Sequence, residues 1–82
     1  MKSTFLTKGT CAKSIEIELE DGIVRSVKFY GGCDGNLQGV SRLVEGMPAA
    51  EAVRRLRGIR CGRKTTSCPD QLAQALEQAL GY

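Results

Sequence analysis

The feature that most constrains this chain is a cysteine followed by a proline at the start of a predicted helix, Pro69–Leu80. Proline suits the first helical position because it has no N–H to leave unpaired and its φ is already helical. Cys68 then lies at or beside the N-cap, where free backbone N–H groups and the helix dipole favour a thiolate. The other three cysteines, Cys11, Cys33 and Cys61, fall in glycine-marked loops. We expect all four to meet at one site.

Because the chain is short, a site that cross-links its loops would stabilise the fold. A domain of 82 residues buries only about 60–65% of the surface of its unfolded chain, so its hydrophobic core is marginal. Aromatic residues make up 5% of the chain and Trp is absent, so the core must consist of Leu, Ile, Val and Ala. We expect one domain over residues 1–82, because no linker or repeat interrupts the sequence.

Cellular location decides which cysteine chemistry is favoured. No apolar run approaches the roughly 18 residues of a membrane span, and the polar first residues do not resemble a signal peptide. We therefore expect a cytoplasmic protein with no membrane partner. Thiols stay reduced in the cytoplasm, which favours metal binding or redox chemistry over structural disulfides.

Hydrophobic periodicity predicts strands in the first part of the chain. Residues 2–7 suit a short strand, and Ser14–Glu20 alternates between apolar and polar side chains, as a half-buried strand does. Ile23–Tyr30 follows the turn residues Asp21 and Gly22 as an antiparallel partner. We expect its apolar residues to divide between two faces, with Ile23, Val27 and Phe29 on one and Val24 and Tyr30 on the other.

Helices are predicted in the rest of the chain. Asn36–Glu45 is the first, a second begins at Pro48 and runs to Leu56 before Gly58, and Pro69–Leu80 is the last. Strands followed by helices predict an α+β fold, with a two- to three-stranded antiparallel meander before three helices. The apolar residues of the first helix that we expect to face inward are Leu37, Val40, Leu43 and Val44.

The spacing of the four cysteines leaves several chemistries open. None of them forms a C-x-x-C pair, whereas a shared Cys₄ site suits Zn²⁺ and equally suits an iron–sulfur cluster. The chain has no His, so a mixed site would take oxygen ligands from Asp34 or Asp70. The alternatives are a redox pair of Cys61 and Cys68, four inert buried thiols, and disulfides in an oxidising compartment.

A basic segment precedes the last predicted helix. Residues 54–64 contain half of the chain's 12 lysines and arginines and no acidic residue. One interpretation is a solvated helix face, and the other is an adaptor surface that docks an acidic protein partner or a phosphate-bearing ligand. No aromatic stacking platform accompanies the charge, so we expect no nucleic-acid partner. The cations of the basic segment are Arg54, Arg55, Arg57, Arg60, Arg63 and Lys64.

The residues around all four cysteines resemble the TSCPD domain family, whose five-residue signature is Thr66–Asp70 in this chain. The small stand-alone, four-cysteine branch of the family is the most similar. The domain also occurs at the C-terminal end of some ribonucleotide reductases, so the resemblance implies an accessory role to a reductase. Since 82 residues cannot supply the radical-bearing barrel of that reaction, we expect no intrinsic catalysis. The other matching segments are Gly9–Cys11, Phe29–Gly39, Leu43–Gly46 and Gly58–Gly62.

The order of predicted elements is also similar to that of the NifU/IscU-type iron–sulfur scaffold proteins. Those scaffolds carry an Asp two residues after their first cysteine and a His before their last, where this chain has Lys13 and Ser67. Replacing these ligands by the extra thiolate of Cys61 implies a tightly retained metal. Zinc is therefore the first choice, and an iron–sulfur cluster, held or carried, is the alternative. The cysteines that correspond to those of the scaffolds are Cys11, Cys33 and Cys68.

Overall fold

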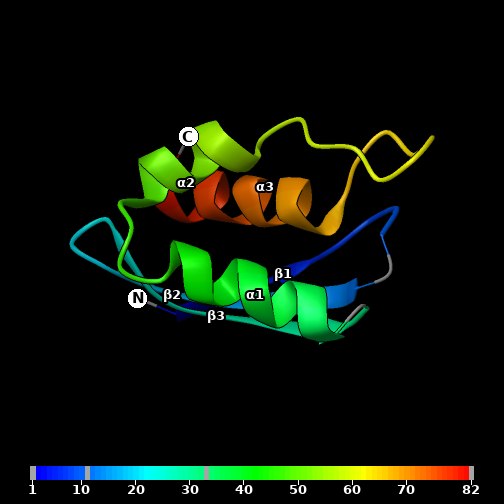
Figure 1. Cartoon of the computed structure of the whole chain (residues 1–82). Helices are drawn as coiled ribbons and strands as arrows, with labels where there is room; N and C mark the ends of the chain where they lie inside the picture. Colours follow the sequence, from blue (N-terminus) through cyan, green and yellow to red (C-terminus); the bar gives the residue numbers. More distant parts are fainter. Residues whose placement is uncertain (1, 11, 33, 82) are drawn as a thin grey trace.

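A three-stranded sheet with helices on one of its faces makes up the fold (Figure 1). The computed structural model describes residues 2–10, 12–32 and 34–81. The strands pair antiparallel in the order β1-β2-β3, so the predicted α+β meander followed by three helices is confirmed. The elements are β1 Lys2–Leu6, β2 Ala12–Glu20, β3 Ile23–Gly31, α1 Asp34–Val44, α2 Ala49–Leu56 and α3 Cys68–Leu80.

The hairpin between β2 and β3 has a two-residue turn. Asp21 and Gly22 have φ values of 54° and 76°, and positive φ at both central positions matches the twist of the flanking strands. An extra residue, Arg25, then enters β3, since Leu19 pairs with Val24 but Glu18 pairs with Ser26. This β-bulge shifts the side-chain alternation of β3 by one residue.

The bulge corrects our prediction for the two faces of β3. Val24 and Val27 were expected on opposite faces, yet both are buried, with exposed fractions of 0% and 7%. A strict period of two would separate residues three positions apart, and the inserted Arg25 brings them back to one face. Tyr30, which was expected on the face of Val24, is instead 41% exposed, because the inserted residue also moves Tyr30 to the face opposite Val24.

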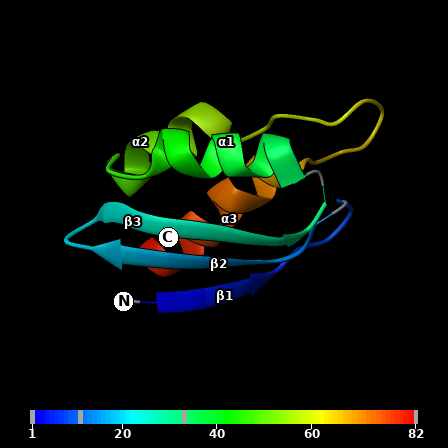
Figure 2. The same cartoon turned by 60° about the horizontal axis from the view of Figure 1, so that its bottom comes forward.

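The helices form a second layer over the sheet. α1 packs against β3, α3 packs across β2 and β1, and α2 packs on α3 (Figure 2). Among the helices of the described residues, none is long and apolar enough to cross a membrane. The core between the layers consists of Ile15, Ile17, Leu19, Val24, Val27, Val44, Ala49, Ala52, Leu72, Ala75 and Leu76.

The inward face of α1 differs from the prediction at one position. Leu37 and Val44 are buried, as expected, whereas Leu43 is 77% exposed. Leu37 and Val44 lie two turns apart on one line, and Leu43 lies about a third of a turn away from that line. Ser41 is buried on the inward face instead, and its hydroxyl donates to the Leu37 carbonyl oxygen at 2.8 Å.

Two matched substitutions in α1 test this assignment. We expect Leu37→Ala to lower the free energy of unfolding by about 2–4 kcal/mol, because it leaves a cavity at a buried site. Leu43→Ala should change it by no more than about 0.5 kcal/mol, because the side chain is exposed. Urea denaturation of both variants measures the difference. Equal losses would contradict the orientation of α1.

Candidate metal centre

The first turn of α3 fixes the position of Cys68. Ser67 is the N-cap residue, with extended backbone at φ −151°, and its hydroxyl oxygen accepts from the Asp70 N–H at 3.1 Å. The same hydroxyl donates to the Ile59 carbonyl oxygen at 2.7 Å. Cys68 is therefore the first residue of α3 and Pro69 the second, one position later than the sequence predicts for proline. Cys68 is half-buried at the positive end of the helix.

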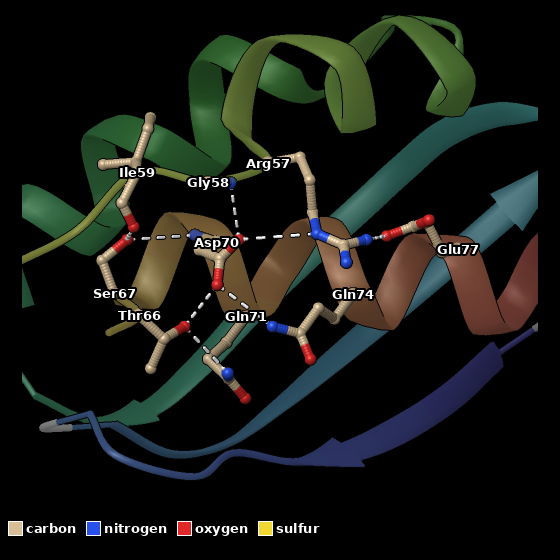
Figure 3. Close-up of polar contacts among 9 residues, drawn as sticks. All are labelled: Arg57, Gly58, Ile59, Thr66, Ser67, Asp70, Gln71, Gln74 and Glu77. Atoms are coloured by element: carbon tan, nitrogen blue, oxygen red, sulfur yellow. Dashed lines mark hydrogen bonds and ion pairs between the residues drawn. The ribbon is translucent and has the colours of Figure 1, made fainter. Parts of the chain in front are cut away.

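A buried carboxylate ties the segment before α3 to the helix itself (Figure 3). Asp70 is 5% exposed, and its oxygens accept from the Gly58 N–H at 2.7 Å, from the Gln74 side-chain amide at 3.0 Å and from the Thr66 hydroxyl. The Arg57 guanidinium lies 3.8 Å away. We call these contacts the Asp70 network. They fix both ends of the segment between α2 and α3.

The Asp70 network also sets the charge state of its carboxyl. Burial acts to raise the pKa of Asp70, but the hydrogen bonds from Thr66, Gly58 and Gln74 and the charge of Arg57 together outweigh it. The pKa of Asp70 is therefore below its usual value. The anion is the form that this arrangement stabilises.

A tight turn carries Cys61 back towards α3. The Lys64 N–H donates to the Cys61 carbonyl oxygen at 3.0 Å, and the Cys61 N–H donates to the Thr66 carbonyl oxygen at 3.2 Å. Gly62, the second residue of the turn, has a φ of 58°, a conformation that glycine adopts without steric cost. The turn thus places Cys61 across from the residues that lead into Cys68.

Gln71 connects the same region to the end of β1. Its side-chain oxygen accepts from the Lys8 N–H at 3.1 Å, and its side-chain amide donates to the Thr66 hydroxyl at 3.0 Å. The Thr66 hydroxyl in turn donates to Asp70. A continuous series of hydrogen bonds therefore runs from the β1–β2 connection to the first turn of α3. Figure 3 shows its part from Gln71 through Thr66 to Asp70. Networks of this kind hold their members in one arrangement.

Cys61 and Cys68 line one cavity of about 200 Å³, which we call the cysteine cavity. Cys61 is exposed, and both cysteines have free thiols. Apolar side chains form much of the wall, so the dielectric around the two sulfurs is lower than in bulk water. The lining residues are Thr10, Asn36, Leu37, Val40, Cys61, Lys64, Ser67, Cys68 and Pro69.

Cys11 and Cys33 lie outside the described residues, but their sequence neighbours lie at this end of the molecule. Thr10 lines the cysteine cavity. Gly32 packs so closely that an added Cβ would lie 3.1 Å from the Ala12 nitrogen and 2.8 Å from the Leu37 Cδ1 atom. Glycine is required at such an approach. The loop between α2 and α3 extends past the same end of the sheet in both views (Figures 1 and 2).

The two aspartates predicted as auxiliary ligands differ in their setting. Asp34 is the first residue of α1, and its side chain lies outside the described part of the structure. Asp70 is in the Asp70 network, where both carboxylate oxygens already accept hydrogen bonds. Within the described ranges, no group of three or more His, Cys, Asp or Glu residues gathers in a way that could hold a metal ion.

The basic segment divides into paired and unpaired cations. Arg54 and Arg55 pair with Glu51, whose pKa is lowered to about 2 by the hydrogen bond from Arg54 and then that from Arg55. Arg57 pairs with Asp70 and Glu77. For the remaining three cations, no ion pair is found in the described residues, and all three are exposed. These are Arg60, Arg63 and Lys64.

The structural roles of Ser67, Asp70 and Gln71 were not part of our sequence prediction. Ser67 followed three residues later by Asp70 resembles the pattern of a helix start, in which the two side chains satisfy free N–H groups. That pattern predicts the Ser67 cap. It does not predict that Asp70 bonds to Gly58, twelve positions earlier, because the partner depends on how the loop returns to the helix.

Comparison with known proteins assigns the chain to a family. The pattern that defines the TSCPD domain matches residues 1–80, and the chain therefore belongs to the TSCPD domain family. No curated protein and no solved structure matches the chain significantly.

The Asp70 network predicts a pH-dependent contribution to stability. We expect Asp70→Asn to lower the free energy of unfolding by about 2 kcal/mol at neutral pH, because the amide cannot accept from all of these donors. The folded pKa of Asp70 is lowered, so the carboxylate stabilises the fold above its unfolded pKa of about 3.9, and the gain is lost as pH falls through the folded pKa. Denaturation at neutral and acidic pH checks this. A difference between wild type and variant that stays constant down to acid pH would contradict it.

Proposed function

We propose that this protein is a small metal-binding domain in which Cys11, Cys33, Cys61 and Cys68 hold one metal ion, with zinc as the first choice. The observation that carries the proposal is the placement of Cys61 and Cys68 on one cavity, at the end where Thr10 also lies. Thiolates are the preferred protein ligands of structural zinc. When bound, zinc cross-links the segments that supply its ligands.

Packing around the sequence neighbours of the other two cysteines supports the same ligand set. Ala12 pairs with Gly31 in the sheet, and Gly32 contacts Ala12 closely. The residues directly after Cys11 and before Cys33 are therefore side by side. Gln71 ties Lys8, near Cys11, to the α3 end of the cysteine cavity.

The charges around the cavity also suit a thiolate metal site. Cys68 is the first residue of α3, so a metal-bound sulfur there would lie at the positive end of the helix. Lys64 lines the cavity, and Arg60 and Arg63 lie in the same loop. Four thiolates around a zinc ion carry a formal net charge of about −2, which nearby cations offset. The unpaired cations of the basic segment thus support the proposed site.

Stability provides a reason for the chain to retain a metal. A core of this size is marginal without a cross-link, and metal binding contributes directly to folding where the ligands are brought together only in the folded chain. The domain would then serve as a structural accessory to a larger redox system or a ribonucleotide-reductase-type protein, in keeping with its family.

The same pair of sulfurs supports a second candidate function, a dithiol redox module. Cys68 at the helix start is the attacking thiolate in this alternative, and Cys61 on the facing turn resolves the mixed disulfide. Both side chains line the cysteine cavity and neither is fully buried, so a disulfide substrate has access to them. The two functions differ in whether the thiols are free when the protein is isolated.

Metal analysis of protein purified anaerobically and without chelator tests the proposal. We expect about one zinc per chain and no visible absorbance, in line with a closed thiolate site. Cys61→Ser and Cys68→Ser should each lose most of the metal and lower the melting temperature, since metal binding and folding are coupled. Iron with sulfide and a brown colour would assign an iron–sulfur cluster instead of zinc.

Asp70→Asn is a control variant. It separates the effect of removing a metal ligand from the effect of weakening the hydrogen bonds that hold the loop between α2 and α3. Because the Asp70 carboxylate is committed to the Asp70 network, this variant should keep its metal stoichiometry while it remains folded. Cysteine variants that fold normally and bind zinc as the parent does would contradict the metal-site proposal.

Alkylation of the isolated protein distinguishes the redox module. A metal site predicts slow modification of Cys68 that speeds up when a chelator is added, because bound thiolates are protected. The redox module predicts fast modification of Cys68 in both conditions and a Cys61–Cys68 disulfide after mild oxidation. Mass mapping of the modified cysteines after a short pulse of reagent gives the result.

A further inference from the structure

A groove of about 420 Å³ runs along the outer edge of β3 and is bounded by α1. We call it the β3 groove. Its β3 side includes Val27, Lys28 and Phe29, and consecutive residues of a strand point to opposite faces. A cavity that touches all three must therefore follow the strand edge rather than one face of the sheet. Leu37, Ser41 and Arg42 of α1 line the opposite side.

Val24 shows which backbone groups of β3 point away from β2. Its N–H donates to the Met47 carbonyl oxygen at 2.9 Å, and its carbonyl oxygen accepts from the Gly46 N–H at 2.7 Å. Residues of an antiparallel strand alternate between pairing with their neighbour strand and pointing outward. Counted past the bulge at Arg25, the outward positions are Val27, Phe29 and Gly31. All three line the β3 groove.

The beginning of the β3 edge is paired with another segment of the chain, and the rest of the edge is unpaired among the described residues. Residues 46–48 run beside the start of β3, where Ile23 and Pro48 form an antiparallel bridge. Within the described residues, no backbone hydrogen bond from another segment reaches the edge from Arg25 to Gly31. Exposed strand edges of this kind accept an added strand.

The other edge of the sheet is less suited to an added strand. β1 has five residues against nine in β3. Short strands discourage pairing at an edge. The cavity beside β1 is closed on its far side by Gln71, Gln74 and Gln78 of α3, whereas the β3 groove is bounded by α1.

We propose that the β3 groove binds an extended segment of a partner protein, which adds to the sheet as a fourth strand beside Val27–Gly31. The groove has a net positive charge, because Lys28 and Arg42 outnumber Glu45, so we expect the segment to carry acidic residues. We also expect it to be apolar at alternate positions, because alternate residues of an added strand face the apolar lining of the groove. A second copy of this chain is disfavoured in the register centred on Lys28, because that pairing would place the two Lys28 side chains opposite each other, and like charges across strands repel.

The position of the groove connects the added strand to the cysteine cavity. Leu37 lines both cavities, so a segment bound beside Gly31 ends next to the site that holds Cys61 and Cys68. Strand addition requires only the backbone of β3 and the α1 side chains, and it does not depend on a bound metal.

The test uses the whole protein as purified, with its metal content measured. A displayed library of random short peptides is selected against it, and the enriched sequences are synthesised. We expect peptides that alternate apolar residues and carry acids. In the complex, NMR-detected hydrogen exchange of the Val27 and Phe29 amides should slow about tenfold or more, because new hydrogen bonds protect them. The Lys28 amide, which already faces β2, should change little.

A matched pair of charge reversals completes the test. Arg42→Glu should weaken peptide binding about tenfold, while Arg55→Glu, the same change on the exposed face of α2 outside the groove, should leave it within about twofold. Failure to select any peptide, or binding that leaves the Val27 and Phe29 amides unprotected, would overturn the proposal. Protection of these amides by concentration-dependent dimers without peptide would assign the edge to a second copy instead. None of these results bears on the metal content of the cysteine site.

Discussion

The arrangement of this small domain around its cysteines depends on the hydrogen bonds of one buried carboxylate. Asp70 holds the Gly58 N–H at the end of α2 and the Thr66 hydroxyl just before α3, so the segment between them must form a loop of fixed span. Cys61 lies within that loop, and Cys68 follows it as the first residue of α3. Without the carboxylate, the Gly58 N–H, the Thr66 hydroxyl and the Gln74 amide would lose an acceptor together.

The family signature can be understood in these physical terms. In Thr66–Asp70, the threonine hydroxyl and the aspartate bind each other, the serine caps the helix, and the proline occupies its first turn. Cys68 takes no part in these hydrogen bonds. Thr66, Ser67 and Asp70 fix the start of the helix through hydrogen bonds and Pro69 fixes it through its ring, and together they place Cys68 at the positive end of the helix.

The amino-acid pattern predicts the element order well, because alternation in β2 and helical spacing in α2 and α3 are strong, local signals. The pattern does not predict side-chain orientation where contacts distant in the sequence determine it. The bulge at Arg25 places Val24 on the buried face beside Val27, and no residue type near Arg25 indicates an inserted residue. Leu43 is apolar, but it lies outside the face of α1 that packs on the sheet. For the site, the pattern singles out Cys61 and Cys68, which do share a cavity, but the fourfold meeting of the cysteines stays a prediction.

The ion pairs of this chain are also either local, within one helix, or long-range, between two helices. Arg54 and Arg55 are satisfied by Glu51 one turn earlier on the same helix, and pairs of this spacing need no tertiary fold. Arg57 reaches across to α3, where its charge supports a buried anion. The loop cations that follow have no such partner among the described residues, and Lys64 borders the sulfurs. The unpaired cations of the basic segment thus lie in the loop that lines the cysteine cavity. In the metal site that we propose, their charge would offset the thiolates, and an acidic partner that competed for these cations would weaken metal binding. The edge of β3 is therefore the surface that such a partner could use without competing for them.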